Sequence, residues 1–524
     1  MSTNGHYCIR QTALDVDIRV VLELHGELPS KVKRNQVPTV DSLPRPRWLA
    51  RTASKAALLT AVTRLCAQSP PLLSERPWHS SEERQIVRDT LGSSAQAVRV
   101  DLAKTYSLAD LIDFAEAHNP ETRVAWENAR AQCASLGIAR SELFPTVTAV
   151  ALAAVDRQEA GFGSQFYRQT IPNFQIALDL TYTIFDFGAR RGRINAERAR
   201  LLAANFGFND VHRQLIYDVS LAYYRLLNAA GQEEAAGASL VNAQAVQQAA
   251  EERLRNGLAT LPDVLEARSA TAQAQYDVQA VLGAERIARG DLTTAMGTSA
   301  AAPIRVQPLG EVPTAESVSD TVEVAIQRAL EQRSDLQAQA AEIRLGQAEW
   351  QQARSAYYPA LNMSATSSVQ ALYIQQQALP WGHTAGFTGG AAVNLNWTVF
   401  DGGARRSRLA QAEARIRQAE ARVAAARDRI EDEVWTAYTN LNTALRQRES
   451  ATALLAAATQ SYSAALESYN YGVRNLLDVT NAQKVLAQAR STDILARTQV
   501  LAALADLAFR TGDAIQANAR RPHP

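Results

Sequence analysis

Two aspartates lie in matching turns of this sequence, and an aspartate carboxylate can accept hydrogen bonds or attract a cation. Asp263 and Asp478 each belong to a Gly-x-x-x-Leu-x-Asp-Val segment, which begins at Gly257 or Gly472. A glycine after a helix readily takes the left-handed conformation that ends it, so each segment predicts a turn between two helices. The residue three places before each aspartate can cap the second helix: Thr260 and Asn475. A capping box is therefore a sufficient structural explanation for both aspartates.

Other kinds of chemistry find little support along the chain. The seven histidines and three cysteines do not fall at metal-ligand spacing. Gly161-Phe162-Gly163 is the nearest approach to a nucleotide-binding glycine motif, but it lies in a predicted hairpin loop and not between a strand and a helix. Lys and Arg (54) balance Asp and Glu (53), which leaves no basic field for nucleic acid. The sequence thus predicts that the protein binds no metal, cofactor or nucleic acid and is not an enzyme.

An internal repeat relates the two turns to each other. The segment 185–191, Phe-Asp-Phe-Gly-Ala-Arg-Arg, returns at 400–406 as Phe-Asp-Gly-Gly-Ala-Arg-Arg. The offset of 215 residues also relates Gly257 to Gly472, and such sustained spacing indicates a duplicated structural unit. In each copy, a strand is expected to meet a long helix through an aspartate and a glycine: Asp186 and Gly188, Asp401 and Gly403.

The repeat divides the chain into two similar units with polar segments around them. The predicted boundaries are 1–68 for an N-terminal extension with a signal-peptide-like segment, 69–100 for a polar linker, 101–298 for the first repeat, 299–316 for a second linker, 317–513 for the second repeat and 514–524 for a tail. Each repeat is expected to hold one helix (107–143 and 319–358), a β-hairpin (about 145–185 and 359–400) and a pair of long helices (about 188–298 and 402–512).

The N-terminal extension resembles an export signal. Arg51 and Lys55 precede the apolar segment 56–62, as a basic region precedes the core of a signal peptide. Because this segment starts some way into the chain, we expect translation to begin downstream of Met1. Cys66 follows the segment, but the residues before it do not match a lipidation signal, so acylation of Cys66 is the less favoured alternative.

Alternation of apolar and polar residues predicts membrane strands in both hairpins. Apolar side chains occupy every second position of 174–184 and of 393–399, and 361–370 alternates as well. A strand of about 11 residues rises roughly 36 Å, which is enough to cross an outer membrane when it is tilted. Loops near 158–172 and 375–386 would give four strands per chain, and these could not close a barrel without other chains. A soluble sheet with one face on a core is the alternative interpretation.

The long helices carry a second regularity, at seven-residue spacing. Nine apolar residues follow it in the second repeat: Leu409, Ile416, Val423, Ile430, Ala437, Ala444, Ala451, Ala458 and Ala465. The first repeat has the matching series: Ile194, Leu201, Phe208, Leu215, Ala222, Ala229, Ala236, Ala243 and Ala250. Heptads sustained over this length predict coiled-coil packing. A helix of roughly 70 residues would extend about 100 Å, which suits a tube.

These features together resemble the TolC-like outer-membrane efflux family, over residues 101–513. The resemblance rests on the duplicated helix–strand–strand–helix unit, the Phe-Asp-x-Gly exit of each hairpin and the paired glycine turns. It implies a mainly α fold with membrane strands, in which three chains, with four strands per chain, form a twelve-stranded outer-membrane β-barrel continuous with a long periplasmic coiled-coil barrel.

The function implied by the resemblance is a passive exit duct of a tripartite efflux or type I secretion system. Its partners would be outer-membrane lipid, two further copies of the chain, a periplasmic adaptor and an inner-membrane pump. The alternative function is a periplasmic coiled-coil scaffold or adaptor, which would have no reason to carry four membrane strands.

The same resemblance assigns a pore gate to the second turn. In the family this turn lies at the periplasmic constriction, where an aspartate ring narrows the pore and an arginine and a tyrosine tether neighbouring coils. Counted from the shared glycine, the matching residues are Asp478, Arg474 and Tyr469, with Asp263 as the partner in the first repeat. The second acid of the family's gate is Asn481 in this chain, so we expect no double acidic ring and a larger share of the gating for Tyr469 and Arg474.

Paired arginines begin both long helices, where positive charge opposes the helix dipole. Arg190-Arg191 and Arg405-Arg406 are interpreted as cations near lipid headgroups. Their position also predicts an anion or carboxylate partner that offsets the unfavourable dipole.

Overall fold

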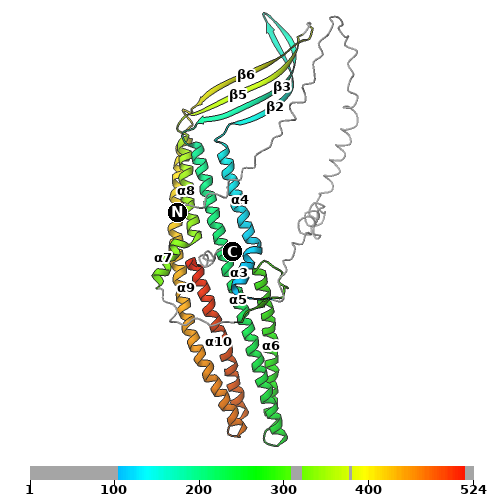
Figure 1. Ribbon diagram of the computed structural model, residues 1–524, viewed down its shortest axis with the longest axis vertical. Coiled ribbons are helices and arrows are strands. Elements are labelled where there is room, and N and C mark those ends of the chain that lie inside the picture. Colours follow the sequence, from blue (N-terminus) through cyan, green and yellow to red (C-terminus); the bar gives the residue numbers. More distant parts are fainter. Residues whose placement is uncertain (1–103, 309–320, 377–379, 514–524) are drawn as a thin grey trace, which may run out of the picture. The chain divides into compact units, whose positions relative to one another are not determined.

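The computed structural model describes residues 104–308, 321–376 and 380–513 (Figure 1). The signal-peptide-like segment, Cys66, the 69–100 linker and the 514–524 tail lie outside the described residues. Within the described ranges, no helix combines the length and the apolar character needed to cross a membrane.

The two repeats have the same order of elements. The first comprises β1 (Thr105–Tyr106), α3 (Leu108–His118), α4 (Pro120–Ser141), β2 (Thr146–Phe162), β3 (Gln165–Phe185), α5 (Ala189–Arg255) and α6 (Leu261–Ala295). The second comprises β4 (Arg305–Val306), α7 (Val322–Gln332), α8 (Ser334–Ser355), β5 (Ala360–Gln376), β6 (Gly382–Asn396), α9 (Ala404–Asn470) and α10 (Leu476–Thr511). The short strands β1 and β4 pair in parallel. β4 lies within 299–316, the segment that was expected to be a linker.

The first helix expected in the first repeat is in fact two helices. α3 and α4 are separated at Asn119, whose side-chain oxygen accepts a hydrogen bond from the Glu121 amide at 2.7 Å. Pro120 takes the first position of α4, where its missing N–H costs nothing. The prediction of one helix over 107–143 is therefore wrong, because it placed this Asn-Pro pair inside a helix and not at a helix start.

The corresponding helix of the second repeat is broken by a long-range contact. α7 and α8 are separated at Arg333, whose backbone is extended and whose side chain is buried. The guanidinium binds Asp335 at 2.8 Å and Glu433 of α9 at 2.7 Å. The prediction of one helix over 319–358 is therefore wrong, because the chain is extended at Arg333, whose side chain binds Asp335 nearby and Glu433 on a distant helix.

One four-stranded antiparallel sheet contains both hairpins, in the order β2-β3-β5-β6. The repeats meet between β3 and β5, where Thr181 faces Ser364. The two edge strands are β2 and β6, one from each repeat.

The first hairpin has the predicted extent, but its strands are longer and its loop is shorter than the sequence suggested. β2 and β3 pair as far as Phe162 and Gln165, so the loop expected at 158–172 is wrong. Pro172 concealed the strand, because a proline normally argues against a strand interior. It lies opposite Val155 in β2, and the pairing of β3 with β5 is interrupted beside it.

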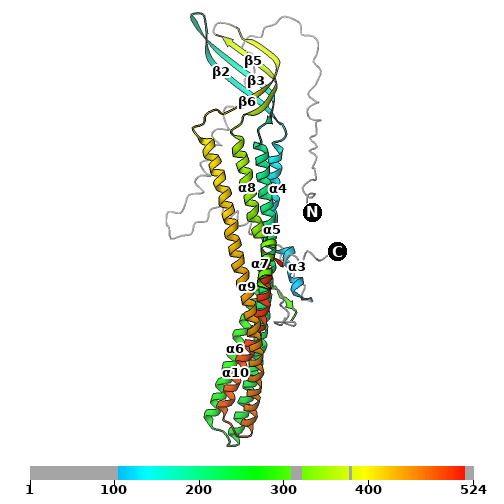
Figure 2. The same cartoon turned by 90° about the vertical axis from the view of Figure 1, so that its left-hand side faces the viewer.

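The two longest helices form the frame of the helical part. α5 and α9 have 67 residues each. α5 packs against α4, α6, α8 and α10, and α9 packs against α7, α8 and α10 (Figure 2). All eighteen residues of the two heptad series are buried or half-buried, which confirms the predicted coiled-coil seams.

A core cluster at the tip of the long helices, away from the sheet, contains residues of both repeats. Its members include Val246, Ala250 and Val264 of the first repeat and Ala458, Tyr469, Leu476 and Val479 of the second. The two helix–turn–helix tips are therefore packed together, and this packing positions the predicted gate residues.

Candidate functional site

The junction between strand and long helix in the first repeat is held by one aspartate. Asp186 accepts hydrogen bonds from the Gly188 amide at 3.2 Å, from the Arg190 amide at 2.8 Å and from Arg190 Nε at 3.0 Å. The same guanidinium donates to the Ile184 carbonyl at the end of β3. Burial alone would raise the pKa of Asp186, but the hydrogen bonds and charge of Arg190 hold it below its ordinary value. The aspartate thus caps α5 and ties its first turn to the strand.

The second repeat builds the same junction. Asp401 accepts hydrogen bonds from the Gly403 amide at 3.2 Å, from the Arg405 amide at 2.9 Å and from Arg405 Nε at 3.0 Å. The guanidinium donates to the Val399 carbonyl, as its counterpart does in the first repeat. The motif is therefore a structural connector that repeats with its geometry intact.

The arginine pairs that follow these motifs have two different environments. Arg190 and Arg405 each bind the aspartate four residues earlier, which is the carboxylate partner that their position predicted. Arg191 and Arg406 are exposed, so the interpretation as cations near lipid headgroups remains a prediction for these two.

The turn in the first repeat uses its aspartate as a helix cap. Gly257 has a φ of 72° and ends α5. One carboxylate oxygen of Asp263 accepts hydrogen bonds from the Thr260 amide at 2.8 Å and from Thr260 Oγ1 at 2.7 Å. The hydrogen bond from the Thr260 hydroxyl lowers the pKa of Asp263 the most. The hydrogen bond from the Thr260 amide and the charge of Arg253 lower it further. Asp263 is therefore a capping residue.

The turn in the second repeat leaves its aspartate free. Gly472 has a φ of 76°, and Asn475 caps α10 by accepting a hydrogen bond from the Asp478 amide at 2.9 Å. The half-exposed Asp478 carboxylate forms no hydrogen bond or ion pair with any described residue. Of the two matching acids, only Asp478 has a carboxylate without a partner among the described residues.

Arg253 joins the two tips and was not identified from the sequence. Its Nη1 donates to the Tyr469 carbonyl at 2.6 Å, and its guanidinium carbon lies 4.6 Å from the centre of the Tyr469 ring. Burial raises the pKa of Tyr469, an effect that Arg253 opposes and Asp263 reinforces. A cation in the last turn of a helix commonly binds backbone carbonyls, but the repeat gave no hint because the matching position is Ser468.

The structure does not assemble the predicted tether within one chain. Arg474 is exposed, and its side chain forms no hydrogen bond or ion pair in the described part of the chain. The buried Tyr469 hydroxyl also has no hydrogen-bond partner there. Arg474, Tyr469 and Asp263 therefore remain a predicted tether, and the contact observed at Tyr469 is the one with Arg253.

Asn481 lies in a groove between α6 and α10, over α5. The groove has a volume of about 670 Å³ and is lined mainly by polar residues, among them Glu266, Gln273, Thr480 and Lys484. Thr480 donates a hydrogen bond of 3.4 Å to Glu266, which is a direct link between the two helices. Across the described ranges, no three His, Cys, Asp or Glu side chains are grouped so that they could hold a metal ion.

Apolar side chains are exposed on both turns. They are Leu258 (67%), Leu261, Tyr471, Val473 (80%) and Leu477. Several exposed apolar residues at one place on a surface are typical of a protein contact site.

Known proteins resemble this chain along most of its length. A family described as "Outer membrane efflux protein" matches residues 111–298 and 325–513. Protein CyaE of Bordetella pertussis is 28% identical over 411 residues, which are 76% of this chain and 83% of that protein. Outer membrane protein OprJ of Pseudomonas aeruginosa is 25% identical over 468 residues, 86% of this chain and 94% of that protein. The structure of the outer-membrane channel OprN has the same fold, with a TM-score of 0.68 at 20% identity over 80% of this chain and 97% of that one.

Proposed function

The chain belongs to the outer membrane efflux protein family, and we propose that three copies of it assemble into the complete channel. Proteins of this family are channels and not enzymes, and this chain is an outer-membrane channel for efflux or secretion with a helical tunnel in the periplasm. The alternative function, a periplasmic scaffold without a pore, is thereby excluded.

The observation that carries the trimer is a sheet with two open edges. β2 and β6 each pair on one side only in a single chain. All 15 residues of β6 are exposed, including Phe387, Val393 and Leu395. Because lipid does not tolerate unpaired backbone groups, β6 of one subunit is expected to pair with β2 of the next. Three such sheets would close a twelve-stranded barrel.

Two measurements on the purified protein test this proposal. The mass of the detergent-solubilised protein is expected to be that of a trimer, and reconstitution into a planar bilayer is expected to give discrete conductance steps. Val393→Arg, on the apolar face of β6, should impair insertion, whereas Asn394→Arg, on the polar face, should insert and change ion selectivity. A monomer without conductance would contradict the proposal, and so would equal effects of the two variants.

We propose the two tips as the docking site of the periplasmic adaptor that connects the channel to an inner-membrane pump. The exposed apolar residues of the turns and the polar groove between α6 and α10 support this assignment. Leu258→Asp combined with Val473→Asp should abolish co-purification with the cognate adaptor and leave the mass of the detergent-solubilised trimer unchanged. The matched control is Val124→Asp, an equally exposed apolar residue on α4. Adaptor binding that survives in the double variant would refute this site.

The free carboxylate of Asp478 is proposed as the acid of the pore gate. Three symmetry-related carboxylates about 7 Å apart would repel one another by roughly 2 kcal/mol per pair at an effective dielectric near 20. Such a ring would attract cations and resist closure. The contact between Arg253 and Tyr469 ties the two tips of each chain together and would oppose opening. Arg474, which is free within the described chain, is proposed to contact the tip of a neighbouring subunit.

A further inference from the structure

The two faces of the four-stranded sheet differ in chemistry. On one face, polar side chains join the strands: the Thr366 hydroxyl donates a hydrogen bond to Asp179 at 2.6 Å, and Gln370 Nε2 donates to Asn173 at 3.0 Å. The other face carries exposed apolar side chains on all four strands: Val147, Val155, Phe174, Ile176, Leu178, Val369, Phe387, Val393 and Leu395. In an outer-membrane barrel, the apolar face meets lipid and the polar face meets the lumen.

The lipid face of the first hairpin ends in charged residues. β2 and β3 keep one register over their whole paired length. Residues that face each other across two strands lie on the same side of the sheet, and the side alternates with each step along the strand. Val155 lies on the apolar face, and the next pairs on that face are Arg157 with Thr170 and then Glu159 with Arg168. Two arginines therefore stand on the lipid face, beyond its last apolar side chains.

The height of the apolar band places these arginines in the membrane. Along β5, the lipid face runs from Leu361 to Tyr373, both of which pair with β6. A strand segment of this length rises roughly 40 Å, or about 29 Å across a membrane at a tilt of 45°, which is close to the apolar band of about 25 Å in such barrels. Gln375 faces Thr170, which in turn faces Arg157. The row that contains Arg157 is thus the first one beyond the apolar band.

Aromatic side chains mark the same level on the other strands. The rings of Phe174 and Tyr373 meet edge to face with their centroids 6.2 Å apart, and Tyr373 stacks on His383 at 6.0 Å. Trp381, directly before β6, is 53% exposed. Aromatic residues are enriched where the apolar core of a membrane meets the headgroups. Because the periplasmic helices follow the opposite ends of these strands, Arg157 lies at the headgroup level of the outer leaflet.

The positive charge of this patch is not neutralised within the chain. Arg157 and Arg168 are exposed, and neither forms a hydrogen bond or ion pair with a described residue. They are diagonal neighbours on adjacent strands, which places them about 7–8 Å apart. Glu159 is also exposed and has no such partner in the described ranges, although it faces Arg168. Two guanidinium groups outnumber this one carboxylate, so the patch attracts an anion.

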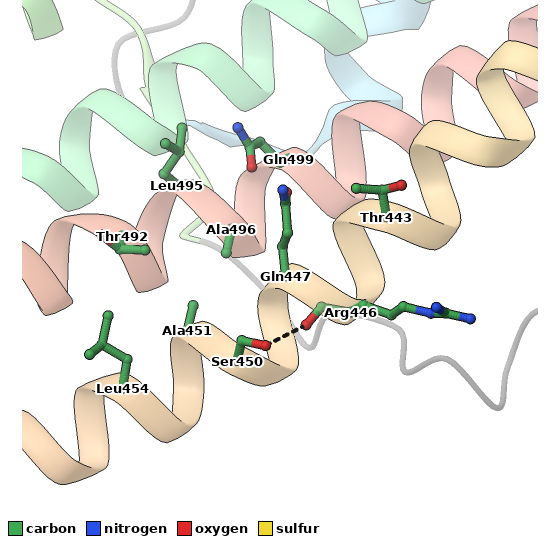
Figure 3. A pocket seen from close by; sticks show the side chains of 10 residues that line it. All are labelled: Thr443, Arg446, Gln447, Ser450, Ala451, Leu454, Thr492, Leu495, Ala496 and Gln499. Carbon is green, nitrogen blue, oxygen red and sulfur yellow. Dashed lines mark hydrogen bonds between the residues drawn. The ribbon is translucent and has the colours of Figure 1, made fainter.

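A single exposed arginine does not make a patch of this kind. Among the described residues that line a groove of about 710 Å³ between α9 and α10, Arg446 alone is charged, and its side chain points away from α10 (Figure 3). Its neighbours in the groove are neutral, among them Thr443, Gln447 and Ser450. Positive charge is therefore gathered at the end of the first hairpin and not in this groove.

We propose that Arg157 and Arg168 bind the phosphate groups of lipopolysaccharide in the outer leaflet of the outer membrane. A guanidinium group donates paired hydrogen bonds whose geometry matches a phosphate. The exposed side chains of Val155 and Phe174, below the arginines, would contact the acyl chains of the same lipid. A molecule with both phosphates and acyl chains thus fits this face better than a free phosphate ion. The inference rests on the proposed barrel, in which this face is turned toward lipid.

Two forms of the lipid test the site on the detergent-solubilised trimer. Intact lipopolysaccharide should bind about tenfold or more tightly than lipopolysaccharide whose lipid A phosphates have been removed. Inorganic phosphate in large excess should not displace the intact lipid. Equal affinities for the two forms, or full displacement by inorganic phosphate, would overturn the assignment. A monomeric mass would contradict the barrel instead, so the two failures are distinguishable.

Variants of the arginines locate the binding. Arg157→Gln combined with Arg168→Gln should lower the affinity for intact lipopolysaccharide to that of the dephosphorylated form, with the trimer mass unchanged. Arg157→Lys combined with Arg168→Lys keeps the charge but loses the paired hydrogen bonds, so its affinity should be intermediate. The matched control, Arg422→Gln combined with Arg446→Gln, removes two exposed arginines of α9 and should keep the natural affinity. Natural affinity in the first variant, or an equal loss in the control, would overturn the assignment.

Discussion

The two strand-to-helix junctions are alike, whereas the two tip turns are not, although one duplication produced both pairs. At the junctions, Asp186 and Asp401 accept the same three hydrogen bonds at nearly the same distances. At the tips, the Asp263 carboxylate is occupied by Thr260, while the Asp478 carboxylate has no partner among the described residues. The repeat is thus preserved where a strand must meet a helix and relaxed where the proposed gate lies.

The difference separates the aspartates that stabilise the fold from the one whose carboxylate is available for function. The hydrogen bonds from Thr260 hold the Asp263 carboxylate against its own turn, whereas no hydrogen bond within the described chain restrains the Asp478 carboxylate. The Asn475 cap takes over the structural task in the second repeat, and this substitution releases the acid three residues later. At matching positions of the two repeats, Asp263 therefore stabilises the fold and Asp478 serves the proposed gate.

The largest effect is expected at the junctions. Asp186→Ala removes the cap of α5 and leaves the largely buried Arg190 without its counter-charge, which should cost about 3 kcal/mol of stability. Asp401→Ala should lower the thermal unfolding midpoint, followed by circular dichroism, to a similar extent. Arg191→Ala, at an exposed neighbouring position, is the control and should leave the midpoint unchanged. Clearly unequal effects of the two aspartate variants would break the equivalence of the junctions.

A smaller effect is expected where the two tips are joined. Arg253→Ala removes a charged hydrogen bond and a cation–π contact with Tyr469, a loss of about 2 kcal/mol of local stability. Amide hydrogen exchange over residues 466–476 should accelerate, and the channel should open more often in planar bilayers. Arg255→Ala, the exposed arginine of the same turn, should change neither. Exchange at the natural rate in Arg253→Ala would show that this contact does not hold the tips together.

The smallest effect is a dependence of stability on pH. The folded-state pKa values of Asp186 and Asp263 lie below the ordinary value of 3.8, so both groups stabilise the fold above that pH. Their contribution should be lost as the pH falls through the folded-state values. The unfolding midpoint of the natural protein should therefore decrease on acidification below about pH 4, more steeply than that of Asp263→Asn. Parallel curves would mean that the capping box does not depend on the charge of Asp263.

Sequence reasoning succeeded where a regular pattern spans many residues. The heptad series predicted the seams of α5 and α9, since a seven-residue period leaves few other ways to bury the apolar side chains. Four strands and a glycine turn in each repeat followed from period-two alternation and from Gly257 and Gly472. Each of these features depends on residues that are close together in the sequence, and each occurs in both repeats.

It failed where contacts between distant segments decide the outcome. At the break between α7 and α8, Arg333 binds Glu433, which is one hundred residues away in the chain. The role of Arg253 depends on Tyr469 in the other repeat, and no repeated residue marks it. The different fates of Asp263 and Asp478 could be suspected from Thr260 and Asn475, but either residue can cap a helix, and only the geometry shows which carboxylate is engaged.

Ion selectivity of the two tip variants tests the central claim most directly. Asp478→Asn and Asp263→Asn make the same chemical change at matching positions, and each can be reconstituted in a planar bilayer. Asp478→Asn should reduce the preference for cations and the block by multivalent cations added on the tip side, whereas Asp263→Asn should leave both at the values of the natural protein. Equal losses in the two variants, or a loss confined to Asp263→Asn, would contradict the assignment of the gate to the free carboxylate.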